Sequence, residues 1–219
     1  MEVKVLKNIL GANEQLARKN RELLDRHDIF AVNIMSSPGA GKTSLILKTI
    51  RELKGKARIG VIEGDVASSV DAETVAREQV PVIQINTGGG CHLDANMVGN
   101  ALGNLPLKAM DILFIENVGN LICPASFALG EHRRVIISSV PEGDDKPIKY
   151  PVIFHDADLV LLNKNDLMPY VKFNLAAFYE AVRNINEHLR IIPVSCTTGE
   201  GISEWLDWLT SQKQACKKS

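Results

Sequence analysis

A phosphate-binding loop is the feature of this chain that most restricts its fold. Residues 36–43 read S-S-P-G-A-G-K-T, follow an apolar run at residues 29–35 and precede a helix-like run at residues 44–53. In a strand–loop–helix unit of this kind, consecutive backbone N–H groups and the helix N-terminus form a concave site for an anion. Gly39 and Gly41 let the backbone curve closely around a phosphate because they have no Cβ atom.

Two side chains of this loop have chemical roles in phosphoryl transfer. Lys42 is placed to reach the β- and γ-phosphates of a nucleotide, and the Thr43 hydroxyl is a ligand for Mg²⁺. Ser36 replaces the first glycine of the pattern G-x-x-x-x-G-K-[ST], which is acceptable if its φ is negative. A chance glycine-rich turn is the alternative. The nucleotide-binding residues predicted in this loop are Ser37, Pro38, Gly39, Ala40, Gly41, Lys42, Thr43 and Ser44.

Composition excludes several classes of protein. The 219 residues are 45% hydrophobic and 23% charged, which is typical of a globular domain. The net charge of −1 provides no basic field for nucleic acid, and no apolar run approaches the roughly 20 residues of a membrane span. The N-terminus is too charged for a signal peptide. We therefore expect a cytoplasmic protein without membrane or nucleic-acid partners, in which the four cysteines are thiols or metal ligands.

Apolar runs and helix-like runs alternate along the chain. This pattern predicts an α/β fold with a mostly parallel twisted sheet and helices on both faces, which binds nucleotides at the carboxyl ends of its strands. We predict one domain over residues 1–219 with an N-terminal helix at about 3–27. That helix either packs on the sheet or serves as an interaction or hinge helix, and Asn13 and Asn20 lie beside its apolar stripe. The predicted strands are residues 29–35, 57–62, 81–86, 111–115, 134–139, 158–162 and 189–194, the later helices are residues 44–53, 71–79, 93–105, 175–185 and 203–209, and residues 211–219 are expected to fray.

A second motif indicates which base is bound. Residues 163–166, N-K-N-D, follow a predicted strand and resemble the N-K-x-D guanine-recognition motif of GTPases. The Asp166 carboxylate can accept hydrogen bonds from N1–H and the N2 amine of guanine, and adenine has neither donor there. Lys164 is expected to lie over the base, and Asn163 to join this segment to the phosphate loop. A polar turn after a strand is the alternative.

Two further segments are expected at the same edge of the sheet. Ser195, Cys196 and Thr197 follow the last predicted strand and resemble the second guanine-contacting loop, in which a backbone N–H reaches O6. Glu116 begins the segment E-N-V-G, which occupies the place of the D-x-x-G switch motif. The N–H of Gly119 would contact the γ-phosphate, and Glu116 would hold a water molecule bound to Mg²⁺.

Asp65 follows the second predicted strand and is another acidic candidate. It could contact Mg²⁺ or orient the attacking water, or it could be a helix cap or a solvated carboxylate; Asp71 is a weaker candidate for the same role. No glutamine is clearly placed to orient water, so efficient hydrolysis by this chain alone is not expected. The predicted catalytic residues are Lys42, Asp65 and Glu116, and the predicted magnesium ligands are Thr43, Asp65 and Glu116.

Cys91, His92 and Cys123 lie in two loops that leave the carboxyl ends of predicted strands. Two thiolates and an imidazole suit Zn²⁺, Ni²⁺ or another borderline-soft ion. Three ligands do not complete a tetrahedron, but two subunits that meet at a two-fold axis could share a closed site. Cys123 lies shortly after Gly119, so a change at the nucleotide would move a metal ligand. The spacing leaves open the alternative that the cysteines are small core residues and His92 begins a helix.

Five segments together resemble the HypB family, GTPases that help to insert nickel into nickel–iron hydrogenase and are related to the urease accessory GTPase UreG. The resemblance covers nearly the whole chain, and its most specific parts are the two segments with cysteine. The matching segments are N-I-M-S-S-P-G-A-G-K-T, I-N-T-G-G-G-C-H-L-D-A, F-I-E-N-V-G-N-L-I-C-P-A-S-F-A-L-G-E, E-G-D-D-K-P-I-K-Y-P and L-N-K-N-D-L.

The resemblance implies a SIMIBI-class P-loop GTPase that slowly hydrolyses GTP to GDP and phosphate with Mg²⁺. It implies a GTP-dependent homodimer with Ni²⁺ or Zn²⁺ at an interface site of Cys91, His92 and Cys123. A nickel-delivery partner protein and a hydrogenase large-subunit precursor are the implied partners. The charged segment at residues 142–151 is expected to be a mobile loop near the nucleotide. The alternatives are a nickel chaperone for another client such as urease, a metal-binding scaffold with a structural nucleotide, and a small-molecule kinase.

Overall fold

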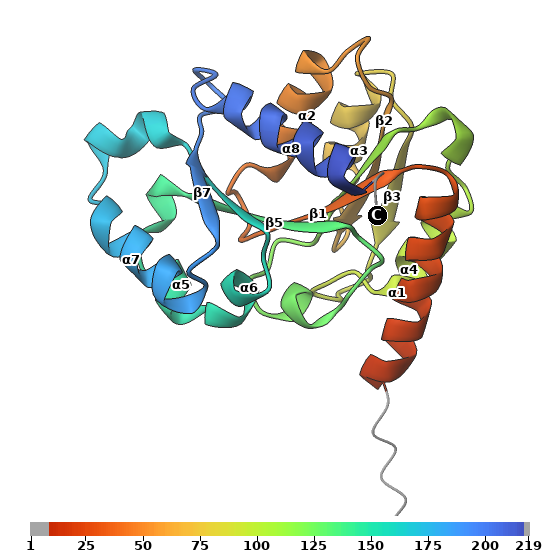
Figure 1. The fold of residues 1–219 in the computed structure, drawn as a ribbon, viewed down its shortest axis with the longest axis horizontal. Coiled ribbons are helices and arrows are strands. Elements are labelled where there is room, and N and C mark those ends of the chain that lie inside the picture. Colours follow the sequence, from red (N-terminus) through yellow and green to blue (C-terminus); the bar gives the residue numbers. More distant parts are fainter. Residues whose placement is uncertain (1–8, 217–219) are drawn as a thin grey trace, which may run out of the picture.

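The strands form one parallel sheet in the computed structural model, which describes residues 9–216 (Figure 1). The strands are β1 (Phe30–Ser36), β2 (Ile59–Asp65), β3 (Val82–Asn86), β4 (Ile112–Glu116), β5 (Arg133–Ser139), β6 (Leu159–Asn163) and β7 (Arg190–Pro193). Their order across the sheet is β3-β2-β4-β1-β5-β6-β7, and each neighbouring pair is parallel. The loops that follow the strands therefore all leave from one edge, with β1 in the middle.

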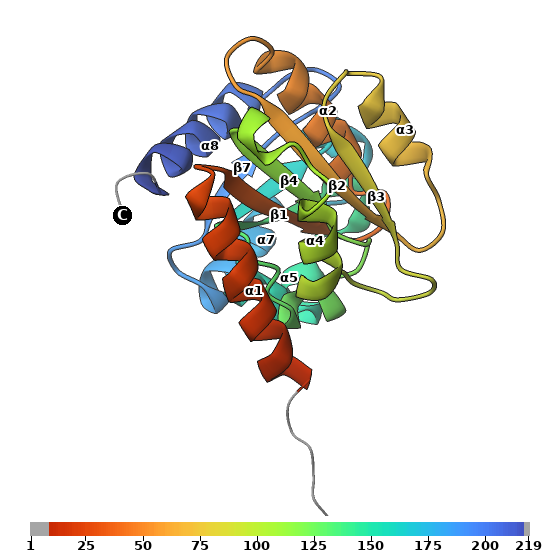
Figure 2. The ribbon, with the colours of Figure 1, turned by 90° about the vertical axis from the view of Figure 1, so that its right-hand side faces the viewer.

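Helices cover both faces of this sheet, as the sequence predicts (Figures 1 and 2). The helices are α1 (Ile9–Arg26), α2 (Lys42–Glu52), α3 (Val70–Ala76), α4 (Ala95–Leu102), α5 (Lys146–Lys149), α6 (Pro151–His155), α7 (Leu175–Ile185) and α8 (Ile202–Cys216), with 3-10 turns η1 (Leu107–Ala109), η2 (Cys123–Ser126), η3 (Val140–Glu142) and η4 (Asn165–Tyr170). α2, α3 and α8 pack on one face, and α1, α4, α6 and α7 pack on the other. Among residues 9–216, no helix combines the length and the apolar character needed to cross a membrane.

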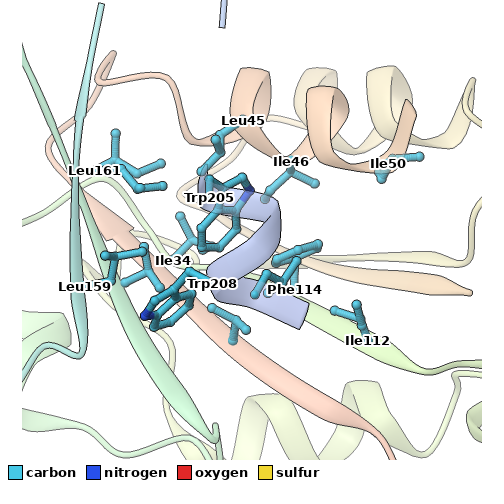
Figure 3. Packing of buried hydrophobic residues seen from close by; sticks show 14 of the residues in the cluster. Ile34, Leu45, Ile46, Ile50, Ile112, Phe114, Leu159, Leu161, Trp205 and Trp208 are labelled. Carbon is cyan, nitrogen blue, oxygen red and sulfur yellow. The ribbon is translucent and has the colours of Figure 1, made fainter. Parts of the chain in front are cut away.

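The core between the sheet and helices α2 and α8 is built around two tryptophans (Figure 3). Trp205 is fully buried and stacks on Trp208, with 5.6 Å between the ring centroids. Its indole N–H donates a hydrogen bond to Oγ1 of Thr49 at 2.9 Å, and the Thr49 hydroxyl donates to the carbonyl of Leu45 at 2.7 Å. The polar atoms of this pair are therefore satisfied inside an apolar cluster, which makes their burial tolerable.

Several predicted boundaries differ from those observed, and two of the differences have a clear physical reason. The strand predicted at residues 57–62 is β2, which continues to Asp65 because it pairs with β3 and β4 on its two sides; the charge of Glu63 does not end it. The tail predicted to fray from residue 211 is helical up to Cys216, which packs against the core, and Gln212 accepts a hydrogen bond from Arg133 Nε at 2.7 Å.

Two other segments can be compared with their predictions: residues 142–151 and the N-terminal helix. Residues 142–151, expected to be a mobile loop, include the helix α5 and begin the helix α6. The predicted N-terminal helix is present from Ile9 onward. Its first residues, 3–8, lie outside the described part of the chain, as do residues 217–219 of the predicted tail.

The hydrogen bond between Trp205 and Thr49 supplies a test of the core. Thr49→Val keeps the shape of the side chain but leaves the buried indole N–H without its acceptor, so we expect a loss of about 1–3 kcal/mol in the free energy of unfolding, measured by urea denaturation. Thr49→Ser keeps the hydroxyl and should lose less. A stability of Thr49→Val equal to that of the wild type would contradict the role of this hydrogen bond.

Candidate functional site

The phosphate-binding loop lies at the carboxyl edge of the sheet, between β1 and α2. Gly39 and Gly41 have φ angles of +76° and +104°, in the left-handed region that favours glycine. A Cβ atom at Gly41 would also collide with Nδ2 of Asn163. Ser36 ends β1 and is not among the residues with positive φ, which is the condition under which serine can replace the first glycine of the motif. The loop therefore has the conformation that the sequence predicts.

The predicted phosphate and magnesium residues converge beside this loop. Lys42 is largely buried, donates to Oγ of Ser36 at 3.2 Å and lies 4.0 Å from Oε1 of Glu116. The Thr43 hydroxyl donates to the same Glu116 oxygen at 2.9 Å. A hydroxyl and a carboxylate held this close are oxygen ligands of the kind that Mg²⁺ uses, and Thr43 and Glu116 could hold that ion.

Glu63 belongs to this cluster, although we did not predict it from the sequence. It pairs in register with Glu116 across β2 and β4, and both side chains are buried. Oε1 of Glu63 and Oε2 of Glu116 have no hydrogen-bond partner. Burial, together with the charge of Glu116, raises the pKa of Glu63 to about 10, so Glu63 holds a proton at neutral pH. Burial also raises the pKa of Glu116, against the opposing charge of Lys42. Buried, unpartnered carboxyl oxygens fit a hard cation.

Asp65 is arranged differently from these two glutamates. Its Oδ1 accepts hydrogen bonds from the backbone N–H groups of Ala67 at 3.0 Å and Ser68 at 2.7 Å, and these bonds lower the pKa of the carboxyl group. The side chain thus closes the turn after β2 and stays ionised at the edge of the sheet. Its role toward magnesium or water stays a prediction, and so does that of Asp71, which lies in the first turn of α3.

The N-K-N-D segment follows β6 and packs against the phosphate loop. Asn163 Nδ2 donates to the carbonyl of Ala40 at 2.9 Å, the contact expected between this segment and the loop. Lys164 Nζ donates to the carbonyl of Gly39 at 2.8 Å. Oδ1 of Asp166 is buried and has no hydrogen-bond partner. An acceptor of this kind suits the two N–H donors on one edge of guanine.

The predicted second guanine loop lies beside this segment. The backbone N–H of Asn165 donates to the carbonyl of Val194 at 3.1 Å, and Ser195 Oγ accepts from the N–H of Thr198 at 3.0 Å. Burial raises the pKa of Cys196 to about 11, so its thiol stays neutral. The half-buried side chain packs against the core, and a contact of its backbone with the base stays a prediction.

The cysteine and histidine residues of the two predicted metal loops are brought together. The donor atoms of Cys91, His92 and Cys123 all lie within 4.8 Å of one another, with 2.8 Å between the sulfur atoms. Cys91 is exposed, so the alternative that these cysteines are core residues is wrong for it. Hydrogen bonding to Cys123 raises the pKa of the Cys91 thiol. The His92 ring stacks on Phe127 at a centroid distance of 3.9 Å. Two sulfur atoms and one nitrogen fit Ni²⁺ or Zn²⁺.

A chain of buried side chains joins the switch segment to both metal loops. Asn117 accepts a hydrogen bond from the N–H of Leu93, next to the first metal loop, at 3.1 Å and donates to Asn33 at 3.3 Å. Asn33 donates to Glu131 at 3.3 Å, and Glu131 accepts from the N–H of Leu129, beyond the second loop, at 2.7 Å. These contacts link residues distant in sequence, and no motif in the sequence identifies them.

The fold and the site together define a P-loop nucleotide-binding protein. The glycine loop follows the central strand of a parallel sheet, and lysine, threonine and carboxylate side chains converge on it, which is the arrangement that binds nucleoside phosphates. Residues 30–193 match the family described as CobW/HypB/UreG, nucleotide-binding domain. The chain therefore belongs to the CobW/HypB/UreG family of SIMIBI-class P-loop GTPases.

Known proteins of this family resemble the chain over nearly its full length. Hydrogenase maturation factor HypB from Azotobacter vinelandii is 48% identical over 211 residues, which cover 96% of this chain and 70% of that protein. The crystal structure of HypB from Archaeoglobus fulgidus has a TM-score of 0.87 and 43% identity, over 93% of this chain and 99% of that one. HypB from Helicobacter pylori, crystallised with nickel, has a TM-score of 0.89 and 34% identity, over 93% and 96%. The predicted family and fold are confirmed.

The raised pKa of Glu63 predicts how stability depends on pH in the absence of Mg²⁺ and nucleotide. Because the folded state binds a proton that the unfolded chain releases, the contribution of Glu63 to stability is fully present below the ordinary pKa of 4.5 and is lost as pH rises toward about 10. Glu63→Gln keeps a neutral side chain, so its free energy of unfolding, measured by urea denaturation across this range, should fall less steeply. Glu187→Gln, at an exposed position, should behave as the wild type. An unchanged slope in Glu63→Gln would show that Glu63 is ionised in the folded protein.

Proposed function

We propose that this protein is a GTPase that couples hydrolysis of GTP to delivery of nickel during maturation of nickel–iron hydrogenase. The observation that carries this proposal is the placement of three groups at one sheet edge: the phosphate loop, the N-K-N-D segment and the cluster of Cys91, His92 and Cys123. The names of the relatives, hydrogenase maturation factors, and the nickel complex of the Helicobacter pylori protein support it.

In the proposed reaction, each residue of the phosphate site has one role. The loop N–H groups and Lys42 would hold the β- and γ-phosphates, and Thr43 and Glu116 would hold a magnesium ion, which would supply positive charge to those phosphates. Asp166 selects guanine. Asp65 stands at the edge where it could orient the attacking water, whose oxygen bonds to the γ-phosphorus as the bond to the β–γ bridging oxygen breaks. The sequence places no glutamine clearly to orient this water, which is consistent with slow turnover.

The switch segment gives a physical route from the nucleotide to the metal. A Cβ atom at Gly119 would lie 3.0 Å from three atoms of Pro38, so this backbone touches the phosphate loop directly. Asn117, in the same segment, holds the N–H of Leu93 beside the first metal loop. A γ-phosphate that displaces Gly119 would thus act on both metal loops. A coupling free energy of about 1–3 kcal/mol is typical of such linkage.

A homodimer is part of the proposal because one chain offers only part of a metal coordination sphere. Three donors from one subunit and donors from a second copy could complete a closed site. Large apolar side chains are exposed after the carboxyl ends of the strands: Val66 and Val70 follow β2, and Ile122 precedes Cys123. Apolar residues of this kind on a surface favour association with another protein. The further partners proposed are a nickel-delivery protein and the precursor of the hydrogenase large subunit.

Asp166→Asn tests guanine recognition. The amide replaces one acceptor oxygen by an NH₂ donor that faces the N2 amine of guanine, so we expect GTP to bind about 10- to 100-fold more weakly. Xanthosine triphosphate, which has a carbonyl oxygen at that position, should bind the variant better than it binds the wild type. Fluorescent-nucleotide displacement measures both affinities, with Asp207→Asn on the exposed side of α8 as the control. Undiminished GTP affinity would contradict the assignment.

Titration with Ni²⁺ in two nucleotide states tests the coupled function. The thiolate-to-metal absorbance of the protein is followed first with GDP and then with a non-hydrolysable GTP analogue, and the mass of the species is measured in parallel. We expect the nickel affinity to differ by about 5- to 150-fold between the states, as a coupling of this size gives. We also expect one metal ion per dimer with the GTP analogue.

Two variants serve as controls for this titration. Lys42→Ala should retain nickel binding but lose the effect of the nucleotide, because it weakens the hold on the phosphates. Cys123→Ser should show weaker thiolate absorbance in both states, because only the Cys91 thiolate remains. Identical titrations in the two states of the wild type would make any role in nickel delivery indirect, and absent GTP turnover with metal and partners present would favour a scaffold.

A further inference from the structure

The N-terminal helix α1 touches both segments that carry the metal ligands. It lies beside α4, which begins just after the first metal loop (Figure 2). Two side chains on its inner face, Asn13 and Asn20, are only 7% and 6% exposed. A buried amide is stable only when its donors and acceptors are paired, so the partners of these asparagines indicate what the helix does.

Each asparagine joins the two metal-ligand segments to each other. Oδ1 of Asn13 accepts from the N–H of Ala95 at 2.8 Å, and its Nδ2 donates to the carbonyl of Ala128 at 2.8 Å. Nδ2 of Asn20 donates to the carbonyls of Ala95 at 2.7 Å and Leu129 at 2.9 Å. Ala95 belongs to the segment of Cys91 and His92, and Ala128 and Leu129 belong to the segment that contains Cys123. None of these bonds goes to the phosphate loop or the N-K-N-D segment.

Helix α1 and the two metal-ligand segments pack so closely that the distance between them is fixed. A Cβ atom at Gly130, where φ is +103°, would lie 2.6 Å from Cβ of Asn20, and one at Gly99 would lie 2.9 Å from Oδ1 of Asn20. Arg21 Nε also donates to the carbonyl of Gly130 at 2.8 Å. Phe127, adjacent to a carbonyl that Asn13 holds, stacks on the His92 ring. Displacement of Asn13 would therefore reach a metal ligand through a single aromatic contact.

We propose that α1 is a clamp for the metal site. Asn13 and Asn20 are positioning residues that hold the two segments at the separation at which the Cys91, His92 and Cys123 donors converge. This inference rests on the proposed metal-binding function. The clamp acts on geometry and not on the ion itself, so its loss affects the distance between the sulfur atoms even when no metal is present.

Asn13→Ala removes both bonds of one clamp residue and is compared with Thr49→Val, which removes a buried hydrogen bond on the opposite face of the sheet. We expect nickel affinity, read from thiolate-to-metal absorbance, to fall about tenfold or more in Asn13→Ala, with GDP affinity unchanged. Thr49→Val should bind nickel as the wild type does. Equal nickel affinity in Asn13→Ala and the wild type, or an equal loss in Thr49→Val, would overturn the proposal.

A second measurement needs no metal. Diamide converts the thiols of Cys91 and Cys123 to a disulfide, taking up two electrons and two protons, at a rate that reports how often the sulfur atoms meet. We expect slower disulfide formation in Asn13→Ala than in the wild type. Asn13→Asp keeps the bond from Ala95 but opposes the Ala128 carbonyl with an acceptor, so it should also be slower if the alanine variant does not fold. Unchanged oxidation rates would contradict the clamp.

The wild-type titrations separate this inference from the proposed function. If the wild type binds nickel equally in both nucleotide states, the coupled delivery function fails, and the clamp is still decided by the variants. If it binds no nickel, both fail. If nickel binding depends on nucleotide and Asn13→Ala matches the wild type, the function stands and the clamp is wrong.

Discussion

The hydrogen bond between Asn33 and Asn117 is the interaction on which both parts of the site depend. Asn33 lies in β1, the strand that ends at the phosphate loop, and Asn117 follows the carboxylate at the end of β4. Both side chains are fully buried, so each amide is stable only in the orientation that pairs its atoms. That orientation in turn places the Leu93 N–H at one end and the Glu131 carboxylate at the other. One buried pair thus aligns the nucleotide edge with the metal loops.

Parallel pairing concentrates polar groups that would be unfavourable elsewhere in the core. Because β2 and β4 run in register, Glu63 and Glu116 face the same space, and two buried carboxyl groups cannot both ionise there at low energy. Lys42 and the Thr43 hydroxyl offset part of the charge, and a proton on Glu63 removes more. A sheet optimised for stability alone would carry apolar residues at these positions. The unpartnered oxygens fit the proposed magnesium site, in which a cation would be their partner.

Local patterns predicted the fold and much of the site, whereas contacts between distant residues could not be predicted. Gly39 and Gly41 adopt the positive φ that the loop motif requires, and this requirement is local. Glu63 was missed because it lies in a strand buried on both faces, where alternation is absent, and its register with β4 is not visible in one sequence. The start of α4 could have been predicted from Asp94, because an aspartate before an apolar run is typical of a helix N-cap. The predicted helix nevertheless began at residue 93. Asn13 was placed beside an apolar stripe and is buried, because its partners are backbone groups.

The two sides of the metal cluster are held unequally, and this asymmetry bears on how a nucleotide could change it. The first side is tied at Leu93 by the buried chain and at Ala95 by both asparagines of α1. The second side is tied at residues 128–129, beyond η2, and touches the phosphate loop at Gly119. Cys123 lies between those two points, in a short 3-10 turn next to the exposed Ile122. In the proposed cycle, a shift of Gly119 would be taken up between Gly119, which touches the phosphate loop, and residues 128–129, which α1 holds. In this proposal, Cys123 would follow the nucleotide along its own segment, and Cys91 would follow it through the hydrogen bond that Nδ2 of Asn120 donates to the Cys91 carbonyl at 3.2 Å.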